Sequence, residues 1–242
     1  MKTKSLIIIA AIALAAQFGF AAAKKAEEKK SMEAASTGIK TLEPMGIAPD
    51  FTLTGQDGKI YSLKDYKGKI VVLEWFNNDC PYVEKHYGTD NMQKLQEKYT
   101  GQGVVWFSVS STKVENAIEA KELSKTYADR KSKATAILMD NNGLIARSYG
   151  AKTTPHMFVI GTDGKVAYMG AIDDNDSFRK DTVKNAKNYV SQALDAILGN
   201  KKVEVEQTKP YGCSVKIYHE TQKPRHCRHH RWIAWHRKSG GD

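Results

Sequence analysis

The chain has 242 residues, a formal net charge of +10 at pH 7 and 41% hydrophobic residues, a share that supports a packed domain core. The positive charge is concentrated at the two ends, because residues 31–215 hold 24 basic and 23 acidic side chains, a net of +1. A nearly neutral central part has no basic surface of the kind that binds nucleic acid. We therefore expect no nucleic-acid partner.

Residues 1–23 predict a signal peptide. Lys2 and Lys4 precede the apolar run SLIIIAAIALAAQFGF, and Ala21–Ala23 supply the small residues of a cleavage site. The alternative is an uncleaved membrane anchor. Residues 24–42 are charged and rich in small residues, as in a linker. The sequence therefore predicts an exported protein, periplasmic or secreted, with no stable membrane association after cleavage.

Strand-like and helix-like segments alternate through residues 43–200, the expected domain. TLTGQDGKIYSL predicts two short strands around a turn, and the apolar runs 67–76, 104–110 and 134–140 predict buried strands. Helical segments are expected after Cys80 and over 113–131, and a hairpin is expected to turn at Asp163-Gly164. This order is typical of an α/β domain with a central mixed sheet flanked by helices.

An amphipathic helix is expected to close the domain at Gly199. Its apolar face would be formed by Val183, Ala186, Val190, Ala193 and Ile197. Residues 201–216 follow as a C-terminal segment that carries Cys213.

Cys80 stands where an apolar strand gives way to polar sequence, directly before Pro81. Proline is favoured in the first helical turn, so Cys80 is expected at a helix N-terminus. The unpaired N–H groups there stabilise a thiolate, the reactive form of cysteine, although the neighbouring Asp79 opposes it. The alternative is a buried structural thiol.

Thr154-Pro155 leads directly into an apolar strand, where proline removes a ladder donor. One interpretation is a cis peptide bond that turns the backbone of Thr154 toward a neighbouring loop. The other is an ordinary proline at the start of a strand.

Four stretches within residues 43–216 carry a family resemblance: GIAPDFTL, KIVVLEWFNNDCP, GAKTTPHMFVIGTDGKVAYMGAID and, at the end, KPYGCSVK. They resemble the thioredoxin-like superfamily, in particular its peroxiredoxin-like (redoxin; alkyl hydroperoxide reductase/thiol-specific antioxidant) branch. The resemblance implies a thioredoxin-like fold, with Cys80 as the attacking cysteine and Thr154-Pro155 as the cis-proline loop beside it.

The chain departs from both active-site signatures of that superfamily. Val83 stands where thioredoxins carry their second cysteine, and Asn77 and Leu73 stand where peroxiredoxins carry a threonine and a proline. Exchange through a local two-cysteine loop is therefore excluded. Peroxide activation lacks its usual threonine, although Asn77 keeps a hydrogen-bond donor. A copper-handling relative would need a second cysteine where Glu84 stands.

These residues predict an exported thiol-dependent oxidoreductase of antioxidant or thiol-disulfide type. Cys80 would attack a protein disulfide or a peroxide, Cys213 would resolve the intermediate, and an external thiol reductant would reset the enzyme. The alternative for Cys213 is an isolated thiol or a purely structural link. The substrate groove is assigned to Thr154, Pro155, Asn77, Pro81 and Trp75. No cofactor or metal is expected. The alternative is a thioredoxin-fold binding or chaperone-like module without redox turnover. The sequence leaves the oligomeric state and the identity of the reductant open.

Residues 217–242 form a basic tail rich in histidine and arginine. His226, Cys227, His229 and His230 lie close together but lack a two-plus-two ligand spacing, so a disordered extension is expected and not a metal site.

Overall fold

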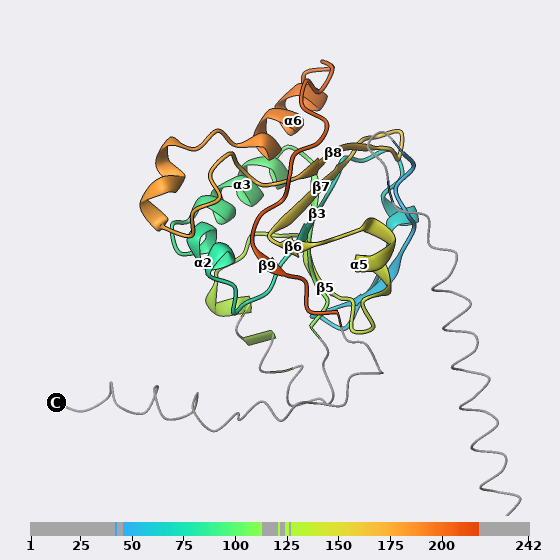
Figure 1. Ribbon diagram of the computed structural model, residues 1–242. Coiled ribbons are helices and arrows are strands. Elements are labelled where there is room, and N and C mark those ends of the chain that lie inside the picture. The colour runs from blue at the N-terminus through green and yellow to red at the C-terminus, as the bar shows by residue number, and fades with distance from the viewer. Residues whose placement is uncertain (1–41, 43–45, 113–120, 122–123, 126, 218–242) are drawn as a thin grey trace, which may run out of the picture. The chain divides into compact units, whose positions relative to one another are not determined.

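The computed structural model describes residue 42 and residues 46–112, 121, 124–125 and 127–217 (Figure 1). The expected signal peptide, all but the last residue of the linker, and the basic tail from residue 218 lie outside these residues. Across the described parts of the chain, no helix is both long and apolar enough to cross a membrane.

The domain is built on a mixed sheet, seven-stranded in the described residues, in the order β2-β1-β5-β4-β3-β7-β8 (Figure 1). The strands are β1 (Thr52–Gly55), β2 (Ile60–Ser62), β3 (Val71–Trp75), β4 (Val105–Ser110), β5 (Ala136–Met139), β7 (His156–Ile160) and β8 (Val166–Gly170). β3, β4 and β5 are parallel, and the other neighbours are antiparallel. The predicted central mixed sheet is confirmed.

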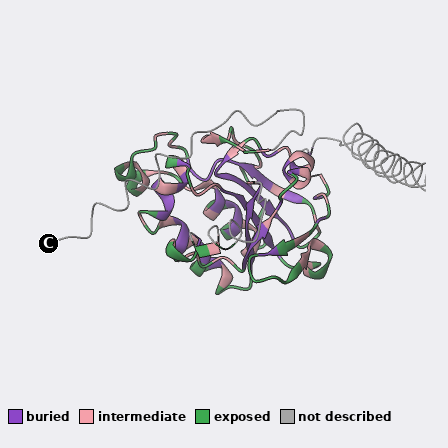
Figure 2. Cartoon of the chain, turned by 90° about the horizontal axis from the view of Figure 1, so that it is seen from below, coloured by how far each residue is buried: buried purple, intermediate pink, exposed green. Residues whose placement is uncertain are grey.

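Helices cover both faces of this sheet. α2 (Pro81–Tyr87), α3 (Asn91–Thr100) and α6 (Tyr189–Leu198) pack on one face, and α5 (Leu144–Tyr149) packs on the other (Figure 1). Short 3-10 helices occur at η1 (Leu63–Tyr66) and η2 (Lys180–Asn185). Buried residues run along the strands between the two layers (Figure 2). Alternation along β3 sends Val72 into one core and Leu73 and Trp75 into the other.

The closing helix is shorter than the sequence predicts. Asn188 caps it by accepting a hydrogen bond from the Ser191 N–H at 2.8 Å, so the helix starts at Tyr189. The backbone just before is held extended, since Asn188 bridges to Asp173 and the Tyr189 N–H binds Ile172 O. The prediction that Val183 and Ala186 belong to this helix is therefore wrong.

Two other helical predictions need a comment. The helix after Cys80 is divided into α2 and α3, because Asp90 adopts a left-handed conformation with φ of 57°. In the segment 113–131, residues 121, 124–125 and 127–129 are helical, and most of the remainder lies outside the described residues.

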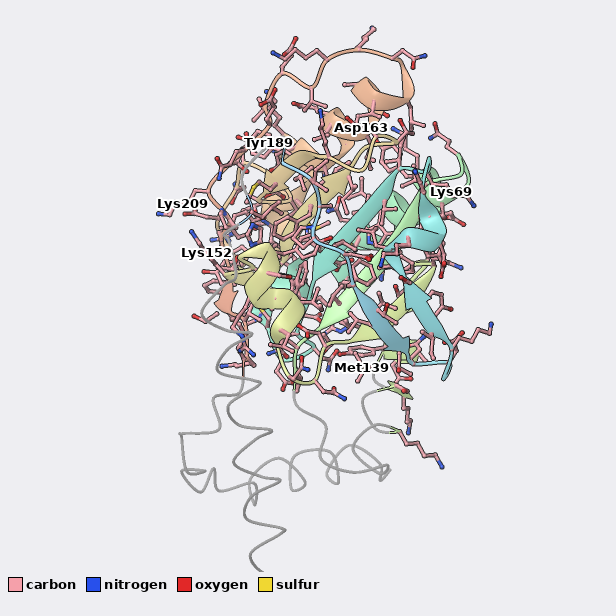
Figure 3. All side chains as sticks on the ribbon, turned by 90° about the vertical axis from the view of Figure 1, so that its right-hand side faces the viewer. Lys69, Met139, Lys152, Asp163, Tyr189 and Lys209 are labelled. Carbon is pink, nitrogen blue, oxygen red and sulfur yellow. The ribbon has the colours of Figure 1, made fainter. Side chains whose placement is uncertain are left out.

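After α6 the chain runs back across the edge of the sheet. Met169 in β8 exchanges backbone hydrogen bonds with Glu206 and Thr208, at 3.0 and 3.1 Å. The segment then forms β9 (Cys213–Ser214), which pairs with β6 (Thr153–Thr154) as a separate two-stranded sheet (Figure 1). The side chains of Lys152 and Lys209, both exposed, point away from the body of the domain here (Figure 3).

Candidate active site

Cys80 is the N-cap residue of α2, and Pro81 occupies the first helical position. The turn before it is closed by the Cys80 N–H, which donates to Asn77 O at 3.1 Å, and Cys80 O accepts the N–H of Glu84 at 2.9 Å. The residue is 1% exposed. The expected position between strand and helix is confirmed, so the sulfur lies near the positive end of the helix.

The Thr154-Pro155 peptide bond is cis. The carbonyl oxygen of this peptide bond, Thr154 O, faces Cys80 and accepts a hydrogen bond from Cys80 Sγ at 3.0 Å. Two segments 74 positions apart in the sequence therefore meet at one polar contact. The sulfur, although buried, is in contact with hydrogen-bonding groups.

Cys213 lies directly opposite Thr154 in the β6–β9 pair, and Ser214 lies opposite Thr153. Gly212 brings the segment this close. Its φ is 133°, and a Cβ there would clash with the carbonyl of Thr154. Because Thr154 contacts both Cys80 and Cys213, the two cysteines share one site.

The two thiols ionise differently. Burial raises the pKa of Cys80, but hydrogen bonds from the Thr154 side chain, the Val83 N–H and Cys213 favour the thiolate and hold the pKa below its usual value. Burial raises the pKa of Cys213 to about 11, as do its hydrogen bond to Cys80 and the negative charge there, while Lys216 acts the other way. Cys80 is thus the thiol that ionises first.

The remaining groove residues lie in different surroundings. Pro81 is exposed beside Cys80, and Asn77 is half-buried, where its Oδ1 accepts the Asp79 N–H at 3.0 Å. The groove assignment of Trp75 is wrong. Its side chain is fully buried against Tyr149 and Phe158 on the opposite sheet face from Cys80, because β3 alternates.

Arg130 holds the loop that precedes Cys80, a role that the sequence did not reveal. Its guanidinium donates to Asn78 O at 2.6 Å, to Asn78 Oδ1 and to Glu84 Oε2 at 2.9 Å. Glu84 also binds Lys180 Nζ at 2.7 Å. One side chain therefore fixes both the loop and the helix on either side of the cysteine.

Glu74 is a buried carboxylate in β3, on the same sheet face as α2 and α3. It accepts hydrogen bonds from four side chains: Tyr87, Gln96, Trp106 and Ser108. Burial raises its pKa to about 7, and those donors limit the rise. An acidic residue inside an otherwise apolar strand was the available sequence signal.

Lys85 and His86 are both fully buried on α2. They lie against Asp173 and Tyr211 and not against the Cys80 sulfur. Among the described residues, no group of three or more histidine, cysteine, aspartate or glutamate side chains is arranged to hold a metal ion. The histidine-rich tail lies outside them.

Comparison with known proteins identifies the family. Residues 45–169, just over half of the chain, match the AhpC/TSA family. A thiol-disulfide oxidoreductase ResA of Bacillus thuringiensis is 31% identical over 119 residues, which are 49% of this chain and 64% of the relative. A protein of the same name from Geobacillus thermodenitrificans is 31% identical over 128 residues, 52% of this chain and 69% of that protein. The first match thus spans less than two thirds of its relative.

Solved structures support the fold. An uncharacterized conserved protein of Geobacillus kaustophilus superposes with a TM-score of 0.61 at 26% identity, over 75% of this chain and 95% of that one. A hypothetical protein of Sinorhizobium meliloti superposes with a TM-score of 0.64 at 23% identity, over 74% and 97%. The family match, the thiol-disulfide oxidoreductase relatives, the mixed sheet and the cis-proline beside a cysteine at a helix start together confirm the predicted thioredoxin-like fold. The chain belongs to the AhpC/TSA family.

Proposed function

We propose that this chain is an exported thiol-disulfide oxidoreductase whose redox pair is Cys80 and Cys213. The observation that carries the proposal is the register of the β6–β9 pair, in which Cys213 lies opposite the residue whose carbonyl binds Cys80 Sγ. The name of the ResA relatives supports the same chemistry. Neither of these two cysteines is part of a disulfide in the structure.

The proposed reaction is two successive thiol-disulfide exchanges. The Cys80 thiolate attacks one sulfur of a substrate disulfide, forms a mixed disulfide and expels the other sulfur as a thiolate. Cys213 then loses its proton and attacks the Cys80 sulfur, which releases the second substrate thiolate and leaves a Cys80–Cys213 disulfide. The two protons lost by the cysteines end on the two product thiols. An external dithiol donates two electrons to restore the enzyme.

The different pKa values of the two cysteines suit these roles. The thiolate is the attacking species, and hydrogen bonds in the site favour it at Cys80. Cys213, with its raised pKa, stays protonated until the mixed disulfide has formed. Once Cys80 is bonded to substrate its negative charge is gone, and one cause of the raised pKa of Cys213 disappears with it.

Thr154 and Pro155 are proposed to orient the partner beside Cys80, and Asn77 to shape the turn from which the cysteine projects. Cys80 is 1% exposed, and Cys213 lies beside it, so we propose that a shift of the Gly212–Ser214 segment gives a disulfide substrate access to its sulfur. The half-buried Cys213 is the more accessible sulfur of the pair.

The test compares two assays on the mature protein, insulin reduction with a dithiol and consumption of hydrogen peroxide. Cys80→Ser is the blank, and Cys213→Ser tests resolution. We expect insulin reduction that is abolished in Cys80→Ser and slowed in Cys213→Ser. Peroxide consumption without insulin reduction would instead assign Cys80 to sulfenic acid formation, with loss of water on closure by Cys213. If the protein shows neither activity, the alternative of a binding or chaperone-like module without redox turnover is favoured.

Export and the domain boundaries are proposed from the sequence. Cleavage after Ala23 would leave a mature chain with linker 24–42, domain 43–200, segment 201–216 and a basic tail. The N-terminal sequence of protein recovered outside the cytoplasm tests this. A mature protein that still begins at Met1 would favour the membrane anchor.

A further inference from the structure

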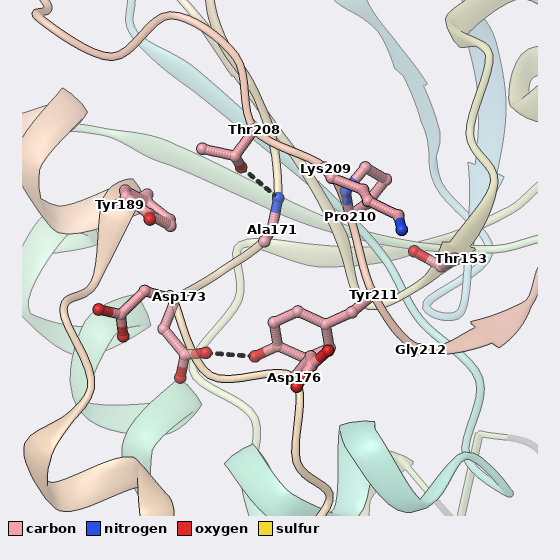
Figure 4. Close-up of a pocket in the computed structure, with 11 residues that line it drawn as sticks. Thr153, Ala171, Asp173, Asp176, Tyr189, Thr208, Lys209, Pro210, Tyr211 and Gly212 are labelled. Carbon is pink, nitrogen blue, oxygen red and sulfur yellow. Dashed lines mark hydrogen bonds between the residues drawn. The ribbon is translucent and has the colours of Figure 1, made fainter.

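Tyr211 lies two residues before Cys213, and its hydroxyl is held inside the domain. The hydroxyl donates to Asp173 Oδ1, and it lies 3.1 Å from His86 Nε2 and 3.4 Å from Lys85 Nζ (Figure 4 shows the contact with Asp173). Lys85 and His86 belong to α2, the helix that Cys80 caps. One hydroxyl therefore joins the helix of one cysteine to the segment of the other.

The proton positions in this cluster follow from its contacts. Because the tyrosine proton points to the Asp173 carboxylate, His86 Nε2 donates to the tyrosine oxygen. His86 Nδ1 is then the acceptor for Asn91 Nδ2 at 2.9 Å. Burial, with the charge of Lys85, lowers the pKa of His86 to about 3, which keeps the ring neutral.

The charges of the cluster are also matched. Lys85 Nζ donates to Asn175 O at 2.7 Å and lies 3.6 Å from Asp173 Oδ2. Both side chains are almost fully buried, at 0% and 2% exposure. A buried ion pair tolerates little displacement, since a lost partner leaves an uncompensated charge. The Tyr211 ring also packs against Tyr82 on α2, with centroids 5.7 Å apart.

Beside this contact the segment is not packed over its whole length. A cavity of about 430 Å³ lies between residues 208–212 and the loop after β8 (Figure 4). Tyr211, Thr208 and Gly212 line it. Residues 208–212 are thus held by a few separate contacts. The hydrogen bond from the Tyr211 hydroxyl to Asp173 is one of them, and it lies two residues from Cys213 in the sequence.

We propose that Tyr211 is a positioning residue that holds Cys213 over Cys80 through the buried cluster of Asp173, Lys85 and His86. This inference rests on the proposed function and deepens it. Holding the segment in place raises the effective concentration of one sulfur near the other. The same contact keeps the sulfur of Cys80 covered. Loosening it therefore weakens the disulfide and opens Cys80.

The test is Tyr211→Phe, which keeps the ring and removes the hydroxyl. In glutathione buffers, we expect the equilibrium constant for the Cys80–Cys213 disulfide to fall roughly tenfold, equivalent to about 30 mV. Tyr99→Phe is the matched control. Its hydroxyl also donates to an aspartate, Asp195 at 3.0 Å, but joins α3 to α6. We expect the control to leave the constant unchanged.

A second measurement does not need the disulfide. In a Cys213→Ser background, Tyr211→Phe should speed alkylation of Cys80 several-fold, while Tyr99→Phe should not. Unchanged alkylation and an unchanged glutathione equilibrium in folded Tyr211→Phe would overturn the inference.

If that variant does not fold, His86→Phe, which removes one donor to the hydroxyl, should shift both readouts in the same direction, and no shift would overturn it. A wild-type protein that forms no disulfide would instead refute the proposed function, and the alkylation comparison would still test the contact.

Discussion

The two cysteines of the site differ in how the chain positions them. Cys80 is placed by local structure, a buried strand, a tight turn and a helix that starts at Pro81. Cys213 is placed by a two-residue strand and by contacts with distant segments. The first arrangement favours a thiolate, and the second brings a protonated partner alongside it. Under the proposed function, the tethered Cys213 takes the place of a local second cysteine, a position that Val83 occupies in this chain.

The largest expected effect comes from removing the locally placed sulfur. Cys80→Ser should abolish insulin reduction, because no other described cysteine has a lowered pKa. Cys213→Ser should leave a protein that forms mixed disulfides but releases product slowly. Mass spectrometry of the trapped species separates the two variants. Equal turnover by both would contradict the distinct roles of the two cysteines.

Gly212→Ala should disrupt the tethered side selectively. A Cβ at this position meets the Thr154 carbonyl, and the residue also needs φ of 133°, so β9 must move at a cost of roughly 1–3 kcal/mol. We expect the rate of disulfide formation to fall at least about tenfold, while alkylation of Cys80 becomes faster because the displaced β9 covers its sulfur less. Gly58→Ala is the control, because it has positive φ but open space around it. An undiminished rate in Gly212→Ala would show that the β6–β9 pairing is dispensable.

Arg130→Lys tests the locally placed side. Lysine cannot reproduce the planar set of donors that binds Asn78 and Glu84 together. We expect the second-order rate of Cys80 with a disulfide substrate to fall roughly three- to tenfold, with the glutathione equilibrium changed less. Stopped-flow kinetics measures this. A rate equal to that of the wild type would show that Arg130 is not needed to hold the loop before Cys80 in its reactive position.

The reactivity of the two thiols should separate with pH. Site-resolved alkylation of the reduced protein should give Cys80 a midpoint below that of an ordinary cysteine, and Cys213 a midpoint near pH 11. Coincident midpoints near that of a free thiol would contradict the asymmetry on which the roles depend.

Substitution of Glu74 should change the reactivity of the two cysteines least, and its main effect should be on the pH dependence of protein stability. Its folded-state pKa of about 7 lies above the ordinary 4.5, so the folded protein favours the protonated form. This stabilisation is present below pH 4.5 and is lost as the pH rises through 7, a change of about 3 kcal/mol. Glu74→Gln should flatten the dependence of unfolding free energy on pH over this range. Identical slopes by urea denaturation would refute it.

The sequence reveals the locally encoded half of the site and not the other half. Cys80 before Pro81, and Thr154 before Pro155, each carry a local signal that depends on the chemistry of proline. The nearness of Gly212 to Thr154 depends on how the whole segment crosses the sheet, which no short motif encodes. The assignment of Trp75 to the substrate groove was wrong because adjacent residues of a strand face opposite sides of the sheet. The predicted start of the final helix was wrong because the backbone at Asn188 is extended and bridges to Asp173.

The most direct test of the central claim is peptide mapping of the mature protein after mild oxidation with oxidised glutathione. The account predicts one dominant cross-link, between the peptides that contain Cys80 and Cys213, which disappears on treatment with a dithiol. Oxidation that stops at glutathionylated Cys80, or that joins Cys80 only to a second molecule, would contradict an intramolecular pair.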